Sequence, residues 1–155
     1  MKIGIIYYSQ TGHTKRVGEE AAHRLRNAGH QVDLVPLEVR GSMNLSAESV
    51  EIKHIPEIDG YDAIVIGSPV HGGRVSGPVH YFLENVRTFD HQPVVLFVTH
   101  FLRKSWGAEQ TLSSFRQMVT AREGDVLGDA EVKWLNLQLR KSITQAAEEI
   151  VMMFG

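Results

Sequence analysis

The sequence contains no cysteine. This absence excludes disulfides, thiol redox centres, cysteine nucleophiles and iron–sulfur clusters, so any redox chemistry requires a bound cofactor to carry the electrons. The chain also lacks an excess of charge of one sign, because 16 Lys and Arg stand against 18 Asp and Glu, for a net charge of −2. It therefore has neither the basic footprint of a nucleic-acid-binding protein nor an acidic tail.

Long apolar runs are missing as well, and we expect no transmembrane helix and no membrane partner. The opening Met-Lys-Ile-Gly leads directly into an apolar run, which leaves no room for a signal peptide and favours a cytoplasmic location. No G-x-S-x-G nucleophile elbow occurs, and no catalytic residue is predicted. The length of 155 residues, without an internal repeat or linker, indicates a single domain over residues 1–155.

Apolar runs typical of strands alternate with helical patterns along the chain. The expected strands are Lys2–Tyr8, Gln31–Leu37, Asp62–Gly67, Pro93–Thr99 and Asp125–Trp134. The expected helix faces are Val17/Ala21/Leu25/Ala28, Val79/Phe82/Leu83/Val86, Leu112/Phe115/Val119 and, at the C-terminus, Leu139/Ile143/Ala146 or Ala147/Ile150/Phe154. This alternation predicts an α/β fold: a doubly wound, five-stranded parallel sheet of order 2-1-3-4-5 with helices on both faces.

Residues 38–60 are the least regular part of the chain. Gly41, Ser42, Pro56 and Gly60 interrupt any periodicity. The only helical pattern there predicts one short helix around Ala47–His54.

The most informative segment is the first loop, Ser9-Gln10-Thr11-Gly12-His13-Thr14, which connects the first strand to the first helix. Hydroxyl groups, a glycine and a helix N-terminus at the carboxyl end of a strand predict a phosphate site. No lysine stands where a G-x-x-x-x-G-K-[ST] loop has one, and no G-x-G-x-x-G occurs, which favours one phosphate monoester over a nucleoside triphosphate or a pyrophosphate. The alternative is an ordinary helix cap.

Two further loops are expected at the same edge of the sheet. The second loop, residues 68–77, contains Ser68-Pro69-Val70-His71-Gly72-Gly73, and the third loop, residues 99–107, contains Thr99, His100, Phe101 and Trp106. Glycines permit close backbone approach, and aromatic side chains grip flat ligands. The three loops are therefore expected to bind a flat molecule that carries a phosphate.

Three histidines in these loops raise the question of a metal site. His13, His71 and His100 have no carboxylate beside them in the loops, although metal-binding histidines usually have such partners. No metal is predicted, and a histidine there is interpreted as a ligand contact. His23, His30, His54, His80 and His91 are interpreted as structural or solvated.

The order of these motifs resembles the flavodoxin family, through Ser-Gln-Thr-Gly-His-Thr, then Gly-Ser-Pro-Val-His-Gly-Gly-Arg, then Pro-Val-His-Tyr-Phe-Leu. The resemblance implies non-covalent FMN. By position, the first loop would bind the FMN phosphate, Pro69 to Gly72 would line one side of the isoalloxazine, and Thr99, His100 and the following residues the other. His71 stands where many family members have Tyr or Trp. The fifth strand has no insertion, and in this respect the chain is similar to the short-chain members of the family.

Three functions remain open at this stage. The first is an FMN-binding protein that transfers electrons between partner proteins. The second is a small NAD(P)H-dependent quinone oxidoreductase, a type that the chain also resembles. The third is a non-redox domain that binds a phosphate ester. The sequence indicates neither the redox partner nor the oligomeric state.

The charge of the second and third loops carries one further hypothesis. Arg74, Arg103 and Lys104 lie there without a carboxylate. Positive charge stabilises the anion that full reduction can leave on the flavin, by roughly 4 kcal/mol for a unit charge at 4 Å before screening. We therefore expect a comparatively high flavin potential and a site suited to anionic partners such as the phosphates of NAD(P)H.

Overall fold

A computed structural model describes residues 1–101, 106–134 and 138–155, without the side chain of Trp106. The elements, in chain order, are β1 (Lys2–Tyr7), α1 (His13–Asn27), β2 (Gln31–Pro36), β3 (Ala63–His71), β4 (Arg74–Val75), α2 (Gly77–Asn85), β5 (Pro93–His100), α3 (Trp106–Ala121), β6 (Asp125–Lys133) and α4 (Leu139–Met153). None of these helices has the length and apolar character needed to span a bilayer.

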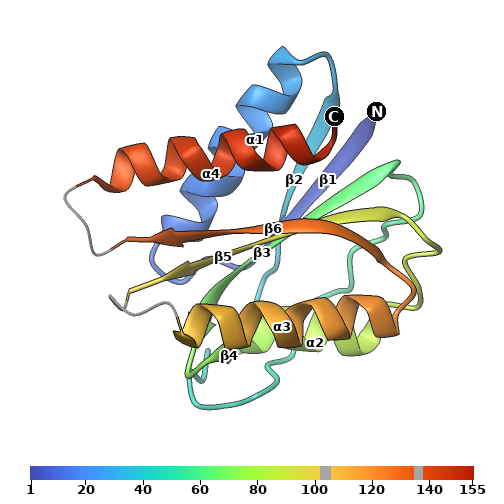
Figure 1. The fold of residues 1–155 in the computed structure, drawn as a ribbon. Coiled ribbons are helices and arrows are strands. Elements are labelled where there is room, and N and C mark those ends of the chain that lie inside the picture. Colours follow the sequence, from blue (N-terminus) through green and yellow to red (C-terminus); the bar gives the residue numbers. More distant parts are fainter. Residues whose placement is uncertain (102–105, 135–137) are drawn as a thin grey trace.

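The sheet has the order β2-β1-β3-β5-β6, with all neighbours parallel. This confirms the predicted 2-1-3-4-5 order, since β5 and β6 are the fourth and fifth strands of the prediction. α1 and α4 cover one face of the sheet, and α2 and α3 cover the other (Figure 1). The strands β1, β3 and β5 are apolar on both faces because both faces are covered.

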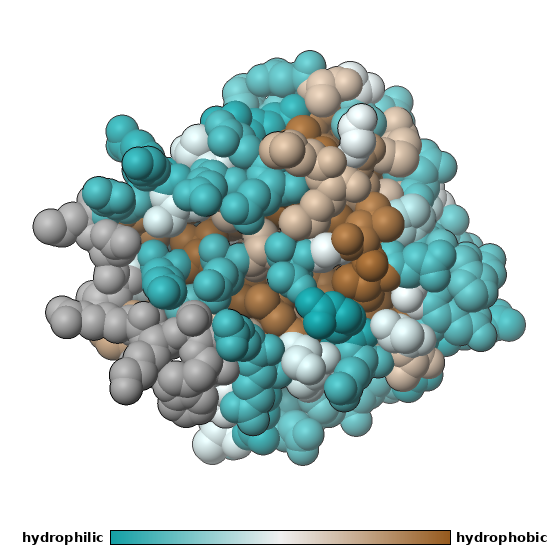
Figure 2. All heavy atoms as spheres, viewed as in Figure 1, coloured by the Kyte–Doolittle hydropathy of each residue, from teal (hydrophilic) through white to brown (hydrophobic). Residues whose placement is uncertain are grey.

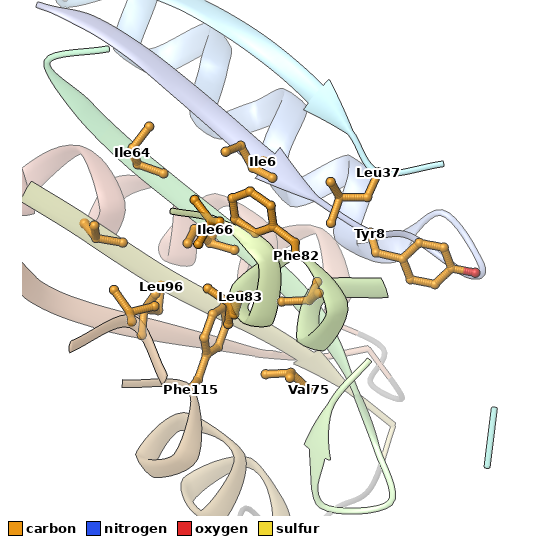
Figure 3. Packing of buried hydrophobic residues seen from close by; sticks show 14 of the residues in the cluster. Ile6, Tyr8, Leu37, Ile64, Ile66, Val75, Phe82, Leu83, Leu96 and Phe115 are labelled. Atoms are coloured by element: carbon orange, nitrogen blue, oxygen red, sulfur yellow. The ribbon is translucent and has the colours of Figure 1, made fainter. Parts of the chain in front are cut away.

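Two apolar clusters form the core, one on each face of the sheet. On the α2/α3 face, Ile6, Ile66 and Leu96 of the sheet pack with Phe82 and Phe115 of the helices (Figure 3). On the other face, alternate residues of the same strands pack with Val17 and Leu25 of α1 and with Ile143 and Ile150 of α4. The helical faces predicted from the sequence are therefore the buried ones, except that Ala28 is exposed and lies just after α1. α1 ends at Asn27, and Gly29 follows with φ +95°, a conformation that favours glycine after a helix.

The helix predicted around Ala47–His54 is wrong. The segment is irregular apart from an isolated antiparallel bridge between Val39 and Ile52. Its backbone groups bond to distant partners instead of to residues four positions away: Val50 N donates to Gly77 O at 3.0 Å, and Lys53 N donates to Glu38 O at 2.9 Å. The apolar side chains of Val50 and Ile52 are buried by these contacts.

The interpretation of residues 68–77 as a continuous loop also needs correction. β3 continues to His71 because Ser68 and Pro69 remain in register with Val98 and Thr99 of β5. The chain then turns through Gly72 and Gly73, whose φ angles are +61° and +76°, and pairs with itself as β4. Two consecutive positive φ angles are typical of a tight two-residue hairpin turn, which glycine adopts without strain.

Candidate functional site

The carboxyl ends of β1, β3 and β5 place the predicted site residues along one edge of the sheet. The first loop follows β1, while Ser68, Pro69, Val70 and His71 form the end of β3, with Gly72 and Gly73 in its hairpin turn. Thr99 and His100 end β5, and Phe101 follows them, 46% exposed. The side chain of Trp106 and the residues Arg103 and Lys104 lie outside the described part of the chain.

The first loop is arranged around the hydroxyl of Ser9. Gly12, with φ +92°, turns its N–H to Ser9 Oγ at 3.1 Å, and Lys15 N donates to the same oxygen at 3.2 Å. Because this oxygen accepts two N–H groups, the one hydrogen of the hydroxyl remains to donate outward. Among the described residues, the amides of His13 and Thr14 at the start of α1 have no acceptor. These donors make the loop suited to an anion.

The first turn of α1 is also suited to an anion by its charge. α1 has no acidic residue there to satisfy the positive end of its dipole. Thr11 Oγ1 lies 2.7 Å from His13 Nδ1. When that nitrogen carries the proton, the hydrogen of Thr11 is available to an anion. Burial, and secondarily Arg16, lower the pKa of His13 from its ordinary value.

The loop is anchored to the neighbouring strand end by buried hydroxyls. Thr14 Oγ1 and Thr99 Oγ1 are 2.8 Å apart and both side chains are 1% exposed. This contact joins residues 85 positions apart and fixes the start of α1 against the end of β5. The other predicted polar residue of the loop, Gln10, accepts a hydrogen bond from the Tyr8 hydroxyl at 2.5 Å.

Sequence reasoning missed the position of Trp134, which it treated only as the last residue of the fifth expected strand. The indole stacks on the His13 ring with centroids 4.3 Å apart and planes inclined by 21°, and it lies 4.7 Å from the Phe101 ring. Trp134 N also donates to His100 O at 3.0 Å. Its place directly after the last strand of a parallel sheet was the signal that could have assigned it to this edge.

Two ring nitrogens at the strand ends have no hydrogen-bond partner among the described residues. They are Nδ1 of His71 on β3 and Nε2 of His100 on β5, and both atoms are buried. A flat ligand with ring nitrogens and carbonyl oxygens would satisfy such atoms. His100 Nε2 also lies 3.2 Å from Glu131 Oε2, although the two do not meet hydrogen-bond geometry.

Of the three cations predicted near the site, Arg74 is the one that the described part of the chain contains. The Arg74 guanidinium donates to the carbonyl oxygen of Ser46 at 2.8 Å, so it holds the 38–60 segment against the hairpin. The expected high flavin potential stays a prediction, since two of its three cations lie outside the described residues. Within those residues, no three His, Cys, Asp or Glu side chains converge as a metal site.

Because His71 is partly buried, we expect the free energy of unfolding to depend on pH. Burial lowers the pKa of His71 below its ordinary value of 6.5, so the unfolded chain takes up this proton at a higher pH than the folded chain does. The contribution of His71 to stability is therefore complete above pH 6.5 and is lost as the pH falls from 6.5 through the lowered pKa. We expect His71→Asn to reduce the loss of unfolding free energy between pH 7 and pH 5, measured by urea denaturation.

The matched control for this prediction is His54→Asn, because His54 is exposed. That variant should show the pH dependence of the unsubstituted protein. If His71→Asn loses as much unfolding free energy between pH 7 and pH 5 as the unsubstituted protein, the lowered pKa of His71 does not contribute to the pH dependence, and the prediction is wrong.

Comparison with known proteins identifies the family. The sequence profile of the flavodoxin domain matches residues 4–129, and the chain belongs to the flavodoxin domain family. Among solved structures, it is similar to oxidised flavodoxin 2 from Bacillus cereus, with a TM-score of 0.68, 20% identity and coverage of 99% of this chain and 97% of that one. A flavoprotein from Lactobacillus acidophilus, crystallised in complex with FMN, gives a TM-score of 0.67 at 24% identity over 84% and 92% of the two chains.

Sequence relatives add a second class of protein. The chain is 32% identical over 90 residues to proteins named NAD(P)H dehydrogenase (quinone) from Methylocella silvestris and from Paraburkholderia phymatum. Each match covers 54% of this chain and 45% of the relative. The chain thus spans about half the length of these relatives.

Proposed function

We propose that the protein binds FMN non-covalently and transfers electrons between partners. The observation that carries this proposal is the first loop, where the Ser9 hydroxyl and the amides of His13 and Thr14 present donors at the positive end of α1. These groups would hold the FMN phosphate together with Thr11 and Gly12. FMN, when bound, supplies one- and two-electron chemistry that a chain without cysteine cannot supply itself.

The remaining site residues fit the flavin ring. Pro69, Val70, His71 and Gly72 would line one side of the isoalloxazine, and Thr99, His100 and Phe101 the other. The unsatisfied Nδ1 of His71 belongs to the first of these walls, so a polar edge of the ring would complete its hydrogen bonding. The complex of the Lactobacillus acidophilus flavoprotein with FMN supports the same ligand.

The second candidate function is a small NAD(P)H-dependent quinone oxidoreductase. It is favoured by the names of the sequence relatives, which are quinone dehydrogenases. A carrier requires only the cofactor and a docking surface, whereas a reductase also requires places for nicotinamide and quinone. The carrier therefore needs fewer features than the reductase, and we rank it first.

Two measurements on the purified protein test these alternatives. After FMN is added and the excess removed, we expect the visible absorption spectrum of a bound flavin, while a colourless protein would leave only a non-redox phosphate-ester binder. The loaded protein is then given NAD(P)H and a quinone. Absence of turnover with the flavin retained supports the carrier, and sustained NAD(P)H oxidation supports the reductase.

A further inference from the structure

The strand β6 forms one edge of the sheet, with β5 on its inner side. No strand in the described part of the chain pairs with its outer side. Trp134 N donates to His100 O of β5, and N–H groups alternate in direction along a strand. The backbone groups of Asp129, Glu131 and Lys133 therefore point away from the sheet. A register shift makes Leu127 an extra residue, so the regular part of this edge runs over residues 128–133.

A groove of about 460 Å³ runs along this edge, between α3 and α4. In Figure 2, which shows this side of the molecule, apolar surface lies between the hydrophilic surfaces of the two helices. The charged residues that line the groove are Glu109, Asp129, Glu131, Lys133 and Glu149. Asp129 is paired with Arg116, which leaves three carboxylates and one ammonium group, so the groove attracts cations.

The two sides of β6 differ in chemistry. Asp129 lies on the side of α3, where it meets Arg116, and Glu131 follows on the same side two positions later. Ala130 and Val132 lie on the side of α4 and are 3% and 1% exposed. A strand added to this edge would place alternate side chains against the carboxylates and the others against the α4 wall. The pattern that fits is Lys or Arg alternating with small or β-branched residues.

The buried ring of His100 adds an independent observation at this edge. It is 4% exposed, and its Nε2, without a hydrogen-bond partner among the described residues, lies 3.2 Å from Glu131 Oε2. Glu131, whose side chain is 37% exposed, therefore lies beside a buried polar atom that has no hydrogen-bond partner among the described residues.

We infer that the outer edge of β6 binds a basic, extended segment of a partner protein by strand addition. A second copy of this chain does not fit, because pairing two such edges would bring their carboxylates together, and edge charges oppose that pairing. Beyond the strand, Trp134 stacks on His13, so a partner segment here would lie next to the first loop. That this partner is the electron donor or acceptor rests on the proposed function.

Strand addition is tested with a synthetic probe, acetyl-Lys-Thr-Lys-Val-Lys-Thr-Lys-amide, and with the same peptide carrying Glu in place of every Lys. Amide spectra of the ¹⁵N-labelled protein are recorded during titration, with and without FMN. We expect the basic peptide to shift the outward amides of Asp129, Glu131 and Lys133, to protect them from exchange, and to bind more weakly as salt is raised. The acidic peptide should cause no such shifts. Binding without FMN separates this proposal from the cofactor assignment.

Three variants separate the contribution of charge from that of the backbone hydrogen bonds. Glu131→Gln should lower the affinity for the basic peptide by about two- to fivefold, because one ion pair is lost. Glu131→Pro should weaken it further, because proline also removes an outward N–H that the sheet itself does not use. Glu57→Gln, the same change at an exposed position away from β6, should have no effect. A folded protein whose β6 amides do not respond to millimolar basic peptide, or whose β6 edge self-associates instead, would overturn the proposal.

Discussion

Replacing Thr11 with aspartate is expected to abolish retention of FMN without harming the fold. Thr11 is exposed at the start of α1, and a carboxylate there would face the phosphate. Two unit charges about 4 Å apart repel by roughly 4 kcal/mol at an effective dielectric constant of 20. Allowing for screening at an exposed position, the dissociation constant should rise by at least about a hundredfold.

The same substitution should leave the melting temperature of the apoprotein unchanged or raise it. The first turn of α1 has no acidic residue, and a negative charge at a helix N-terminus stabilises by about 0.3–1 kcal/mol. Thr11→Val, which removes only the hydroxyl, should lower the affinity for FMN by about tenfold or less. Thr120→Asp, an exposed site in α3 outside the first loop, should leave affinity unchanged. Normal FMN binding by Thr11→Asp would show that the phosphate lies elsewhere.

The second large effect is expected on stability, at Gly67 in the middle of the sheet. Gly67 pairs with Tyr7 of β1 and Phe97 of β5. A Cβ atom added there would lie 2.1 Å from Cζ of Phe97, a ring that is completely buried. Gly67→Ala should therefore reduce the free energy of unfolding by about 3 kcal/mol, measured by chemical denaturation, because neither neighbouring strand can retreat.

Gly60→Ala provides the matched control, since nothing lies within 4 Å of the Cβ it would create. Its free energy of unfolding should change by no more than about 0.5 kcal/mol. Phe97→Leu should cost less in the Gly67→Ala background than alone, because the smaller side chain relieves the overlap. Equal effects of the two alanine substitutions would contradict the packing described here.

The sheet and its covering helices were predictable from the sequence. Apolar runs such as Ile3–Tyr8 and Val94–Val98 are buried on both faces, which removes the polar alternation of a half-exposed strand. Gly29 ends α1 because its positive φ strongly favours glycine. The ends of β1, β3 and β5 lie at one edge because these strands are parallel, and for this reason the candidate site residues at those ends could be named from the sequence.

The remainder depended on contacts between residues distant in sequence. The segment around Val50 and Ile52 has a composition compatible with a helix. Its backbone instead forms hydrogen bonds with Gly77 and Glu38, which replace those of a local helix. The Thr14–Thr99 contact and the Trp134–His13 stack join residues from different elements, which no local pattern reports. The hairpin at Gly72–Gly73 could have been recognised from its two adjacent glycines.

The central claim is that the first loop holds the phosphate of FMN, and calorimetric titration of the apoprotein with FMN and with riboflavin tests it most directly. The two ligands share the ring and the ribityl chain and differ in the phosphate. We predict one FMN per chain and an affinity at least about a hundredfold above that of riboflavin, since two charge-assisted hydrogen bonds supply this difference. Equal affinities would contradict the phosphate assignment, and failure of both ligands to bind would contradict the flavin itself.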